Sequence, residues 1–407
     1  MNRQSSSTYA EMPRIPQLDG LRGIAILLVL FHHCTVVQPG QGGMEAVLSR
    51  LANIGPHGVD LFFVLSGFLI TGILLDTKSL AGYFRKFYTR RALRIFPLYY
   101  LIVLVCVVVL PFVVLKVPAA AHKVARLVSA PSDWPWYVLY LSNFLIAKQQ
   151  NWVHPVLGVT WSLAIEEQFY LVWAPIVFLL DRSKVKTLGL TLLGITFCAR
   201  WLMLLKGYSW IQLYVLPWCR MDGLALGALI AVSLRDGSHY IRRFATAAKW
   251  IAIVGTLFFV CLYTFHLASY DDALVAATGY GEIALVCAAW LVVALNALPG
   301  STTQRVLSSG FLRTFGKYSY AIYLLHLPIR AALRDTVFAS SRVQVVLGHG
   351  ILWQLVFYIF SILAALIGAL LTWNLIERPC LSLKNRLAEY NTSRDASFQL
   401  LGHSSNG

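Results

Sequence analysis

The sequence predicts an all-α polytopic integral membrane protein with about ten transmembrane helices. Three observations predict this class. Apolar runs of about 20 residues, the length that crosses a bilayer as a helix, recur along nearly the whole 407-residue chain. Hydrophobic residues make up 58% of the chain and charged residues only 13%, about half the charged share of a typical soluble protein. The mean hydropathy is +0.65. This composition excludes a soluble enzyme, a disordered protein and a collagen-like fibre.

The apolar runs divide the chain into a polar N-terminal segment (1–16), a transmembrane domain (17–380) and a polar cytoplasmic tail (381–407), so we expect no appended soluble domain. The first run, 20–38, is predicted to be a retained span because it contains ionisable residues and lacks a small-residue cleavage site. Further spans are expected at 58–77, 95–116, 158–181, 188–206, 211–233, 250–268, 278–298, 317–337 and 350–376. The segment 134–147 is too short and too rich in Trp and Pro to be assigned as a span.

The net charge of +16 would indicate a nucleic-acid partner in a soluble protein. Here we interpret it as a record of membrane orientation, because cytoplasmic loops collect Lys and Arg, and we expect no nucleic-acid partner. The basic clusters lie at 78–94, 182–186, 235–249, 305–317 and 378–394. All of them share one side if 134–147 is interfacial or re-entrant, which places both termini in the cytoplasm. The basic stretch 79–94 is expected to lie along the inner membrane surface.

The seven cysteines fall almost entirely within apolar runs and show no CxxC spacing. We therefore expect neither a disulfide framework nor a metal site.

Ionisable side chains within the first span are candidates for function, because charge is costly inside a membrane. Asp19, Arg22 and His33 share one helical face: Arg22 and His33 are within about 20° of each other, whereas His32 is rotated by about 80°. His33 lies about 16 Å further along the helix axis than Arg22. The alternative is a capping Asp19, an interfacial Arg22 and a packed His33.

Two adjacent carboxylates, Glu166 and Glu167, lie in the apolar span 158–181 and are hard to explain as packing. The predicted topology places them at a depth similar to that of His33. A carboxylate can hold a histidine tautomer, so we expect Glu167 or Glu166 to orient His33 as a general base. The alternative is a structural hydrogen-bond network between helices.

Other polar residues near span ends are weaker candidates. Asp60 is interpreted as a cap or a substrate contact, and Ser66 lies in a Ser-Gly run typical of close helix packing. Arg91 and Arg94 share a helical face and could clamp phosphates, although positive-inside anchoring explains them equally well. Further candidate lining residues, or inter-helix ion pairs, are Trp161, Ser162, Arg220, Asp222, Tyr323, His326 and the pair Glu377–Arg378.

An ordered set of motifs between about 16 and 380 resembles the acyltransferase family 3 membrane proteins. The motifs are Leu18-Asp19-Gly20-Leu21-Arg22-Gly23 with the Arg-x10-His spacing to His33, Gly58 to Phe68, Arg91 to Pro97, Trp161-Ser162-Leu163 to Tyr170, Asp222 to Gly227, Phe315 to His326 and Glu377-Arg378-Pro379. A single motif would be weak evidence, but this ordered set is highly specific.

The resemblance implies a multi-pass protein of the bacterial inner membrane that transfers an acyl group, most often acetyl, from cytoplasmic acyl-CoA to a hydroxyl of a surface or exported glycan. It implies acetyl-CoA as donor substrate and no bound cofactor. It also implies an essential pair at Arg22 and His33, and donor use by Arg91 and Arg94. His33 could act as a general base or form an acyl-histidine. The competing classes are a transporter of lipid-linked glycan and a non-catalytic scaffold.

Overall fold

The computed structural model describes residues 15–36, 43–116, 131–152, 154–339 and 350–383, and within them all regular secondary structure is helical. The longer helices are α1 (Pro16–Cys34), α3 (Gly58–Thr77), α4 (Tyr83–Leu104), α9 (Thr160–Leu179), α10 (Arg182–Leu205), α12 (Met221–Asp236), α14 (Ala245–Thr264), α15 (Tyr280–Leu295), α18 (Ser319–Thr336) and α20 (Ile351–Thr372). The shorter α-helices are α2 (Gly43–Leu51), α5 (Leu110–Lys116), α7 (Trp134–Val138), α8 (Ser142–Gln149), α11 (Trp210–Val215), α13 (Ser238–Arg243), α16 (Thr302–Leu307) and α17 (Gly310–Lys317). Short 3-10 or π segments are η2 (Ala52–His57), η3 (Val105–Val109), η5 (Pro131–Asp133), η6 (Leu157–Val159), η7 (Pro217–Cys219), η8 (Val275–Gly279) and η9 (Trp373–Glu377).

Seven helical stretches of the described chain are long and apolar enough to cross a membrane. They are Gly43–Thr77, Tyr83–Phe112, Leu157–Leu179, Arg182–Leu205, Ala245–Thr264, Val275–Leu295 and Ile351–Leu383. The other three predicted spans correspond to α1, to α11 with α12, and to α18, which are shorter or carry more charge. The structure thus supports a polytopic helical membrane protein, and the number ten stays a prediction.

Two predicted segments differ from the structure in detail, and a third, 134–147, is as expected not a span. The predicted span 211–233 is broken, because Pro217 interrupts the helix between α11 and α12. The basic stretch 79–94 is continuous with the following apolar helix from Tyr83 onwards, rather than a separate surface helix. The segment 134–147 forms α7 and the beginning of α8, each too short to span a bilayer.

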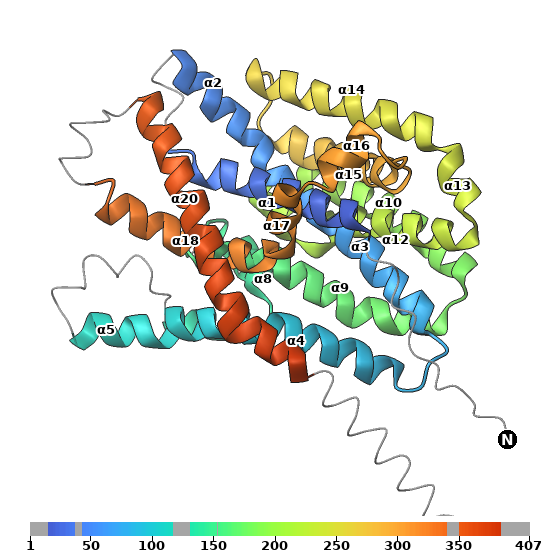
Figure 1. Ribbon diagram of the computed structural model, residues 1–407, viewed down its shortest axis with the longest axis horizontal. Coiled ribbons are helices and arrows are strands. Elements are labelled where there is room, and N and C mark those ends of the chain that lie inside the picture. Colours follow the sequence, from blue (N-terminus) through green and yellow to red (C-terminus); the bar gives the residue numbers. More distant parts are fainter. Residues whose placement is uncertain (1–14, 37–42, 117–130, 153, 340–349, 384–407) are drawn as a thin grey trace, which may run out of the picture.

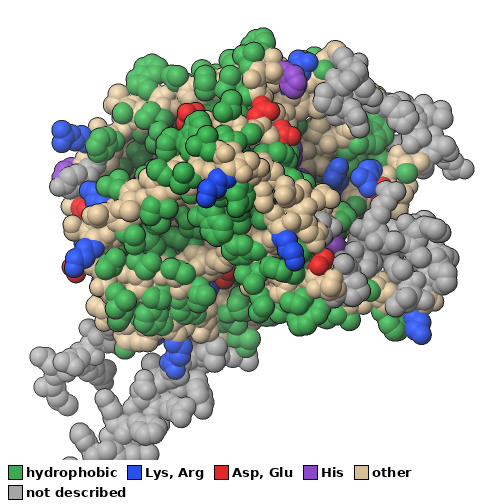
Figure 2. Space-filling model, turned by 180° about the vertical axis from the view of Figure 1, so that it is seen from behind, with side chains coloured by type: hydrophobic (Ala, Val, Ile, Leu, Met, Phe, Trp, Pro, Cys, Tyr) green, Lys and Arg blue, Asp and Glu red, His purple; other side chains and the backbone are tan. Residues whose placement is uncertain are grey.

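Helices α1 and α3 lie within the bundle, between α9, α12, α15, α17 and α18 (Figure 1). Helices α4, α14 and α20 lie at the periphery and expose large apolar side chains. Examples are Leu104, Leu257 and Ile359, each more than half exposed. Hydrophobic side chains cover much of the face shown in Figure 2, with few charges between them. Such a surface is unfavourable in water and suits a bilayer.

Contacts bring three of the predicted basic clusters, 78–94, 182–186 and 235–249, close together. Arg235 pairs with Asp76 at 2.5 Å, Lys78 donates to the Leu180 carbonyl at 2.7 Å, and Arg182 donates to the Arg235 carbonyl at 3.3 Å. The 305–317 segment packs on the N-terminal half of α1, and Leu381 lines a pocket together with residues of α4. Three of the basic loops are thus in direct contact with one another, and the placement of all basic clusters on one side of a membrane stays a prediction.

Glycines allow two helix pairs to approach at backbone distance. A Cβ on Gly67 of α3 would lie 2.0 Å from the Leu224 carbonyl oxygen of α12, so the predicted close packing is confirmed at this position. A Cβ on Gly316 of α17 would lie 1.8 Å from the Asp19 carbonyl oxygen of α1. Because backbone cannot move aside as a flexible side chain can, these positions fix where α1 and α3 sit.

We expect Gly316→Ala to destabilise the protein by about 1–3 kcal/mol or more, since the added methyl group forces α17 away from α1. Gly310→Ala on the same helix is the matched control, because a Cβ there meets no atom within 4 Å. Thermal unfolding of both variants in detergent measures the difference. Equal melting temperatures would contradict the close contact.

Candidate active site

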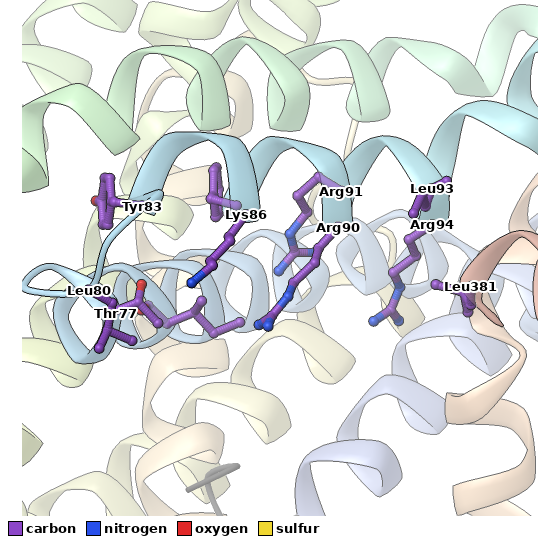
Figure 3. Close-up of a pocket in the computed structure, with 11 residues that line it drawn as sticks. Thr77, Leu80, Tyr83, Lys86, Arg90, Arg91, Leu93, Arg94 and Leu381 are labelled. Atoms are coloured by element: carbon purple, nitrogen blue, oxygen red, sulfur yellow. The ribbon is translucent and has the colours of Figure 1, made fainter. Parts of the chain in front are cut away.

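A basic pocket of about 240 Å³ lies at the end of the molecule where the basic clusters meet (Figure 3). Lys86, Arg90, Arg91 and Arg94 project into it from one side of α4. Lys86, Arg90 and Arg94 are four residues apart and Arg91 is three before Arg94, so these spacings keep them on neighbouring parts of one helical face. Thr77 of α3 lies on another wall. This arrangement of cations suits a ligand with several phosphate groups.

Arg91 and Arg94 also line the next cavity, a middle pocket of about 80 Å³. Arg22 of α1 lines it too, within electrostatic reach of Arg91, Asp19 and Glu166. The Arg91 guanidinium lies 5.3 Å from the centre of the Tyr170 ring, a cation–π distance. The other polar residues that line the middle pocket are Ser66, Ser162, Glu166, Tyr170, Ser319, Tyr320 and Tyr323.

Hydrogen bonds fix several of these side chains. Tyr170 donates to Glu166 Oε2 at 2.7 Å and also bonds Ser66. Tyr323 donates to the Val159 carbonyl at 3.0 Å, and its hydroxyl lies 2.7 Å from Ser162 Oγ. The middle pocket is therefore a constriction with preset polar groups. Three of the predicted lining residues, Ser66, Ser162 and Tyr323, line it.

A third cavity of about 300 Å³, the histidine pocket, follows the middle pocket. The two cavities share Val59 and Tyr323, so the three pockets form a series from the basic clusters to the C-terminal end of α1. His32, His33, His154 and Arg330 line the histidine pocket, together with the aromatic residues Trp152, Trp161, Tyr214, Tyr270 and Tyr323.

Each histidine of this pocket has a defined partner. His33 Nδ1 lies 3.0 Å from His326 Nε2, and His32 Nδ1 lies 3.0 Å from the Ala52 carbonyl oxygen. His154 Nδ1 accepts hydrogen bonds from the backbone N–H groups of residues 156 and 157. Burial raises the pKa of Tyr270, in the loop between α14 and η8, to about 12. Its phenol therefore stays protonated at neutral pH, with its ring edge-on to His32.

The prediction that Glu166 or Glu167 orients His33 is wrong. Glu166 lines the middle pocket, and Glu167 Oε1 is buried without a hydrogen-bond partner among the described residues. The expected depth of His33 assumed that the first span extends to residue 38, but α1 ends at Cys34. His33 therefore lies at the end of its helix, whereas Glu166 is about 9 Å into α9. Arg22 and His33 share a helix and line different pockets.

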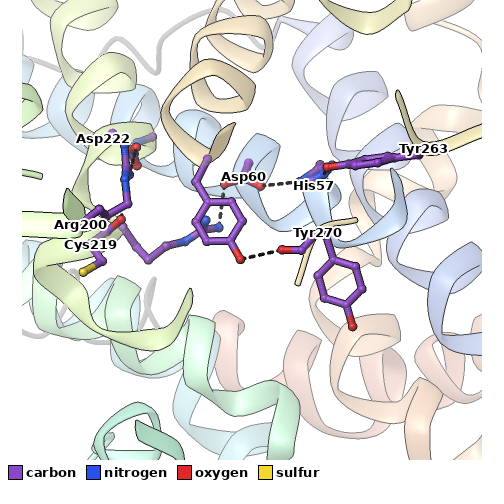
Figure 4. Close-up of polar contacts among 10 residues, drawn as sticks. His57, Asp60, Arg200, Cys219, Asp222, Tyr263 and Tyr270 are labelled. Carbon is purple, nitrogen blue, oxygen red and sulfur yellow. Dashed lines mark hydrogen bonds and ion pairs between the residues drawn. The ribbon is translucent and has the colours of Figure 1, made fainter. Parts of the chain in front are cut away.

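Asp60 is neither a helix cap nor part of a described pocket wall. It is buried and binds Arg220 Nη2 at 2.7 Å and His57 Nδ1 at 3.2 Å, while His57 Nε2 lies 2.6 Å from the Tyr263 hydroxyl (Figure 4). The Arg220 guanidinium lies within 6 Å of four aromatic ring centres. Two of these rings, Trp161 and Tyr214, form a wall of the histidine pocket.

A second buried pair joins Arg200 to Asp222 at 2.5 Å, and Arg200 also donates to the Cys219 and Ala277 carbonyls (Figure 4). Arg220 and Asp222 are thus inter-helix ion-pair residues, one of the two alternatives that the sequence left open. Sequence reasoning missed Arg200, although an arginine within an apolar run was a visible signal. It also missed Lys86, Arg90 and Arg330.

The described residues include no group of three or more His, Cys, Asp or Glu side chains placed to hold a metal ion.

A model of the acyltransferase domain family matches residues 15–373. The O-acetyltransferase OatA of Staphylococcus aureus (strain NCTC 8325 / PS 47) is 27% identical over 387 residues, covering 90% of this chain and 57% of the relative. The putative peptidoglycan O-acetyltransferase YrhL of Bacillus subtilis (strain 168) is 28% identical over 378 residues, covering 90% and 54%. The chain thus spans little more than half the length of these relatives. No solved structure matches it.

Proposed function

The chain belongs to the acyltransferase family whose model covers residues 15–373, and from this premise we propose that it is a multi-pass O-acetyltransferase of the bacterial inner membrane. It transfers an acetyl group from cytoplasmic acetyl-CoA to a hydroxyl of a surface or exported glycan. The observation that carries this proposal is the series of three pockets, basic at one end and histidine-lined at the other. The basic clusters favour a cytoplasmic position for the first pocket and an outer position for the last.

In this proposal the CoA phosphates bind Arg91 and Arg94, and the thioester arm passes Arg22 towards the histidine pocket. Arg22 and His33 are eleven residues apart on one helix, about 16 Å, so a long flexible donor suits the path. The aromatic side chains of the histidine pocket offer the acceptor apolar ring faces, and their hydroxyl and indole N–H groups offer hydrogen bonds. A sugar ring requires both kinds of contact.

His33 acts on the acceptor hydroxyl as a general base. The hydroxyl proton moves to a ring nitrogen, the oxygen attacks the thioester carbonyl, and the carbon–sulfur bond breaks. The CoA thiolate leaves and takes up the proton. In the two-step alternative, His33 itself attacks the thioester, the carbon–sulfur bond breaks, and the CoA thiolate leaves an acetyl-histidine behind. The acceptor oxygen then attacks the acetyl carbon, the bond to the histidine nitrogen breaks, and the acceptor proton balances the charge of the CoA thiolate. Rapid release of one equivalent of CoA without acceptor would distinguish the two-step course.

The test uses the full chain in proteoliposomes, with labelled acetyl-CoA on the basic-pocket side and soluble peptidoglycan fragments on the other. We expect label to appear on the glycan as a base-labile ester, and no transfer with His33→Ala. Movement of a lipid-linked glycan without acyl-CoA, together with no ester formation, would instead identify a transporter.

Donor binding gives a separate prediction for Arg94→Gln. A charge-assisted hydrogen bond to a phosphate contributes about 1.5–3 kcal/mol, so we expect the KM for acetyl-CoA to rise about 10- to 100-fold. The KM for S-acetyl-pantetheine, which lacks the nucleotide phosphates, should not rise. Arg243→Gln is the matched control, because Arg243 is an exposed residue of another basic cluster. Equal effects on both donors would contradict phosphate binding by Arg94.

A further inference from the structure

The hydrogen bonds of His326 determine which of its nitrogens carries the proton. Its Nδ1 lies 2.7 Å from the Tyr323 carbonyl oxygen and 3.2 Å from the Ile322 carbonyl oxygen, both on the preceding turn of α18. A carbonyl oxygen can only accept a hydrogen bond, so Nδ1 must be the donor. In the neutral ring, Nε2 then holds the lone pair.

This assignment fixes the neighbouring histidine as well. His326 Nε2 lies 3.0 Å from His33 Nδ1, and a lone pair on the first requires a proton on the second. The rings are 4.8 Å apart between centres, and the His326 side chain is buried. A neutral His33 therefore carries its proton on Nδ1 and its lone pair on Nε2.

We propose that His326 is a positioning residue that holds His33 in the Nδ1–H tautomer, so that His33 Nε2 is the atom that takes part in acyl transfer. This inference rests on the proposed function for its catalytic meaning. As a base, Nε2 takes the acceptor proton while Nδ1–H keeps its bond to His326. As a nucleophile, the same lone pair attacks the thioester. The neutral imidazole of His326, rather than the carboxylate expected from the sequence, thus orients His33.

His32 provides an internal comparison. Its Nδ1 donates to the Ala52 carbonyl oxygen, so it adopts the same tautomer through a backbone partner that no side-chain substitution removes. The His33 side chain has a backbone hydrogen bond as well, to Val29 one turn earlier in α1, so His326 is one of two partners of the His33 ring among the described residues. A change at His326 removes a partner of His33 and none of His32, so we expect it to shift the tautomer balance of His33 and to leave that of His32 unchanged.

The experiment combines nitrogen NMR of ¹⁵N-histidine-labelled full-length protein with acetyl-transfer assays on two variants. In wild type we expect the His33 resonances, identified by their loss in His33→Ala, to report a protonated Nδ1 and an unprotonated Nε2. His326→Gln places an amide oxygen near the former Nε2, so we expect the tautomer and most activity to be retained. His326→Asn does not reach His33, so we expect mixed tautomers and a loss of about 10- to 100-fold in kcat.

Three results would overturn the proposal: an Nε2–H tautomer of His33 in wild type, an unchanged tautomer in His326→Asn, or equal activity losses in both variants. The wild-type spectrum tests the tautomer of His33 even if a variant does not fold, and the His326→Asn spectrum tests whether His326 holds that tautomer. The spectrum also separates this inference from the proposed function. If the expected tautomer is found but no acetyl transfer is detected, the proposed function is rejected and the positioning of His33 by His326 is retained.

Discussion

Replacing His33 with alanine should lower acetyl transfer by about 10²- to 10⁴-fold, the contribution of a general base, or abolish it if His33 carries the acetyl group. Binding of acetyl-CoA should persist, because the basic pocket lies at the opposite end of the pocket series. Transfer of labelled acetyl groups and equilibrium binding of CoA, measured on the same preparation, separate the two effects.

His32→Ala is the matched control for this prediction. His32 lines the same pocket, and its Nδ1 is held by a backbone carbonyl. We expect the smaller loss of activity for His32→Ala. Activity of His33→Ala at the wild-type level, or a larger loss from His32→Ala, would refute the assignment of His33.

Removing one partner of the buried pair Asp60–Arg220 should destabilise the protein by about 3–5 kcal/mol, because it leaves an uncompensated charge in the core. Arg220 is fully buried and Asp60 is 2% exposed. The Asp60→Ala and Arg220→Met single variants and their double variant form a double-mutant cycle in detergent. We expect the double variant to be much more stable than the sum of the single effects indicates.

The control for this cycle is the peripheral pair Asp76–Arg235. Asp76 is 38% exposed in its side chain, and pairs of this kind contribute about 0–1 kcal/mol. Asp76→Ala should therefore change the melting temperature little. Additive effects within the Asp60–Arg220 cycle would show that the two charges do not compensate each other.

Much of the fold could be predicted from local sequence, because long apolar runs and basic clusters record membrane crossing directly. The break at Pro217 was also visible in the sequence, yet the surrounding run 211–233 is apolar enough to look continuous. The partners of Arg200 and Asp60 could not be predicted, since each lies on a different helix and helical periodicity says nothing about which helices are neighbours.

The candidate site, like the fold, could be predicted only where one helix determines it. The shared face of Arg22 and His33 follows from the geometry of one helix, and both line the pocket series. The prediction that a glutamate orients His33 depended on the relative depth of α1 and α9. It failed because α1 ends four residues earlier than the predicted span. His326 was a candidate lining residue whose contact with His33 only the packing of α18 reveals.

The narrow middle pocket has a consequence for the energy balance of the cell. If the three pockets lead a hydrophilic donor into the bilayer, as proposed, the path must not conduct ions, because the membrane stores the proton gradient. With about 80 Å³, this constriction holds only a few water molecules, and three arginines line it. Their positive charge repels cations and protons. We therefore expect the protein not to conduct protons or other cations between turnovers. Replacing these arginines should increase proton conductance in vesicles.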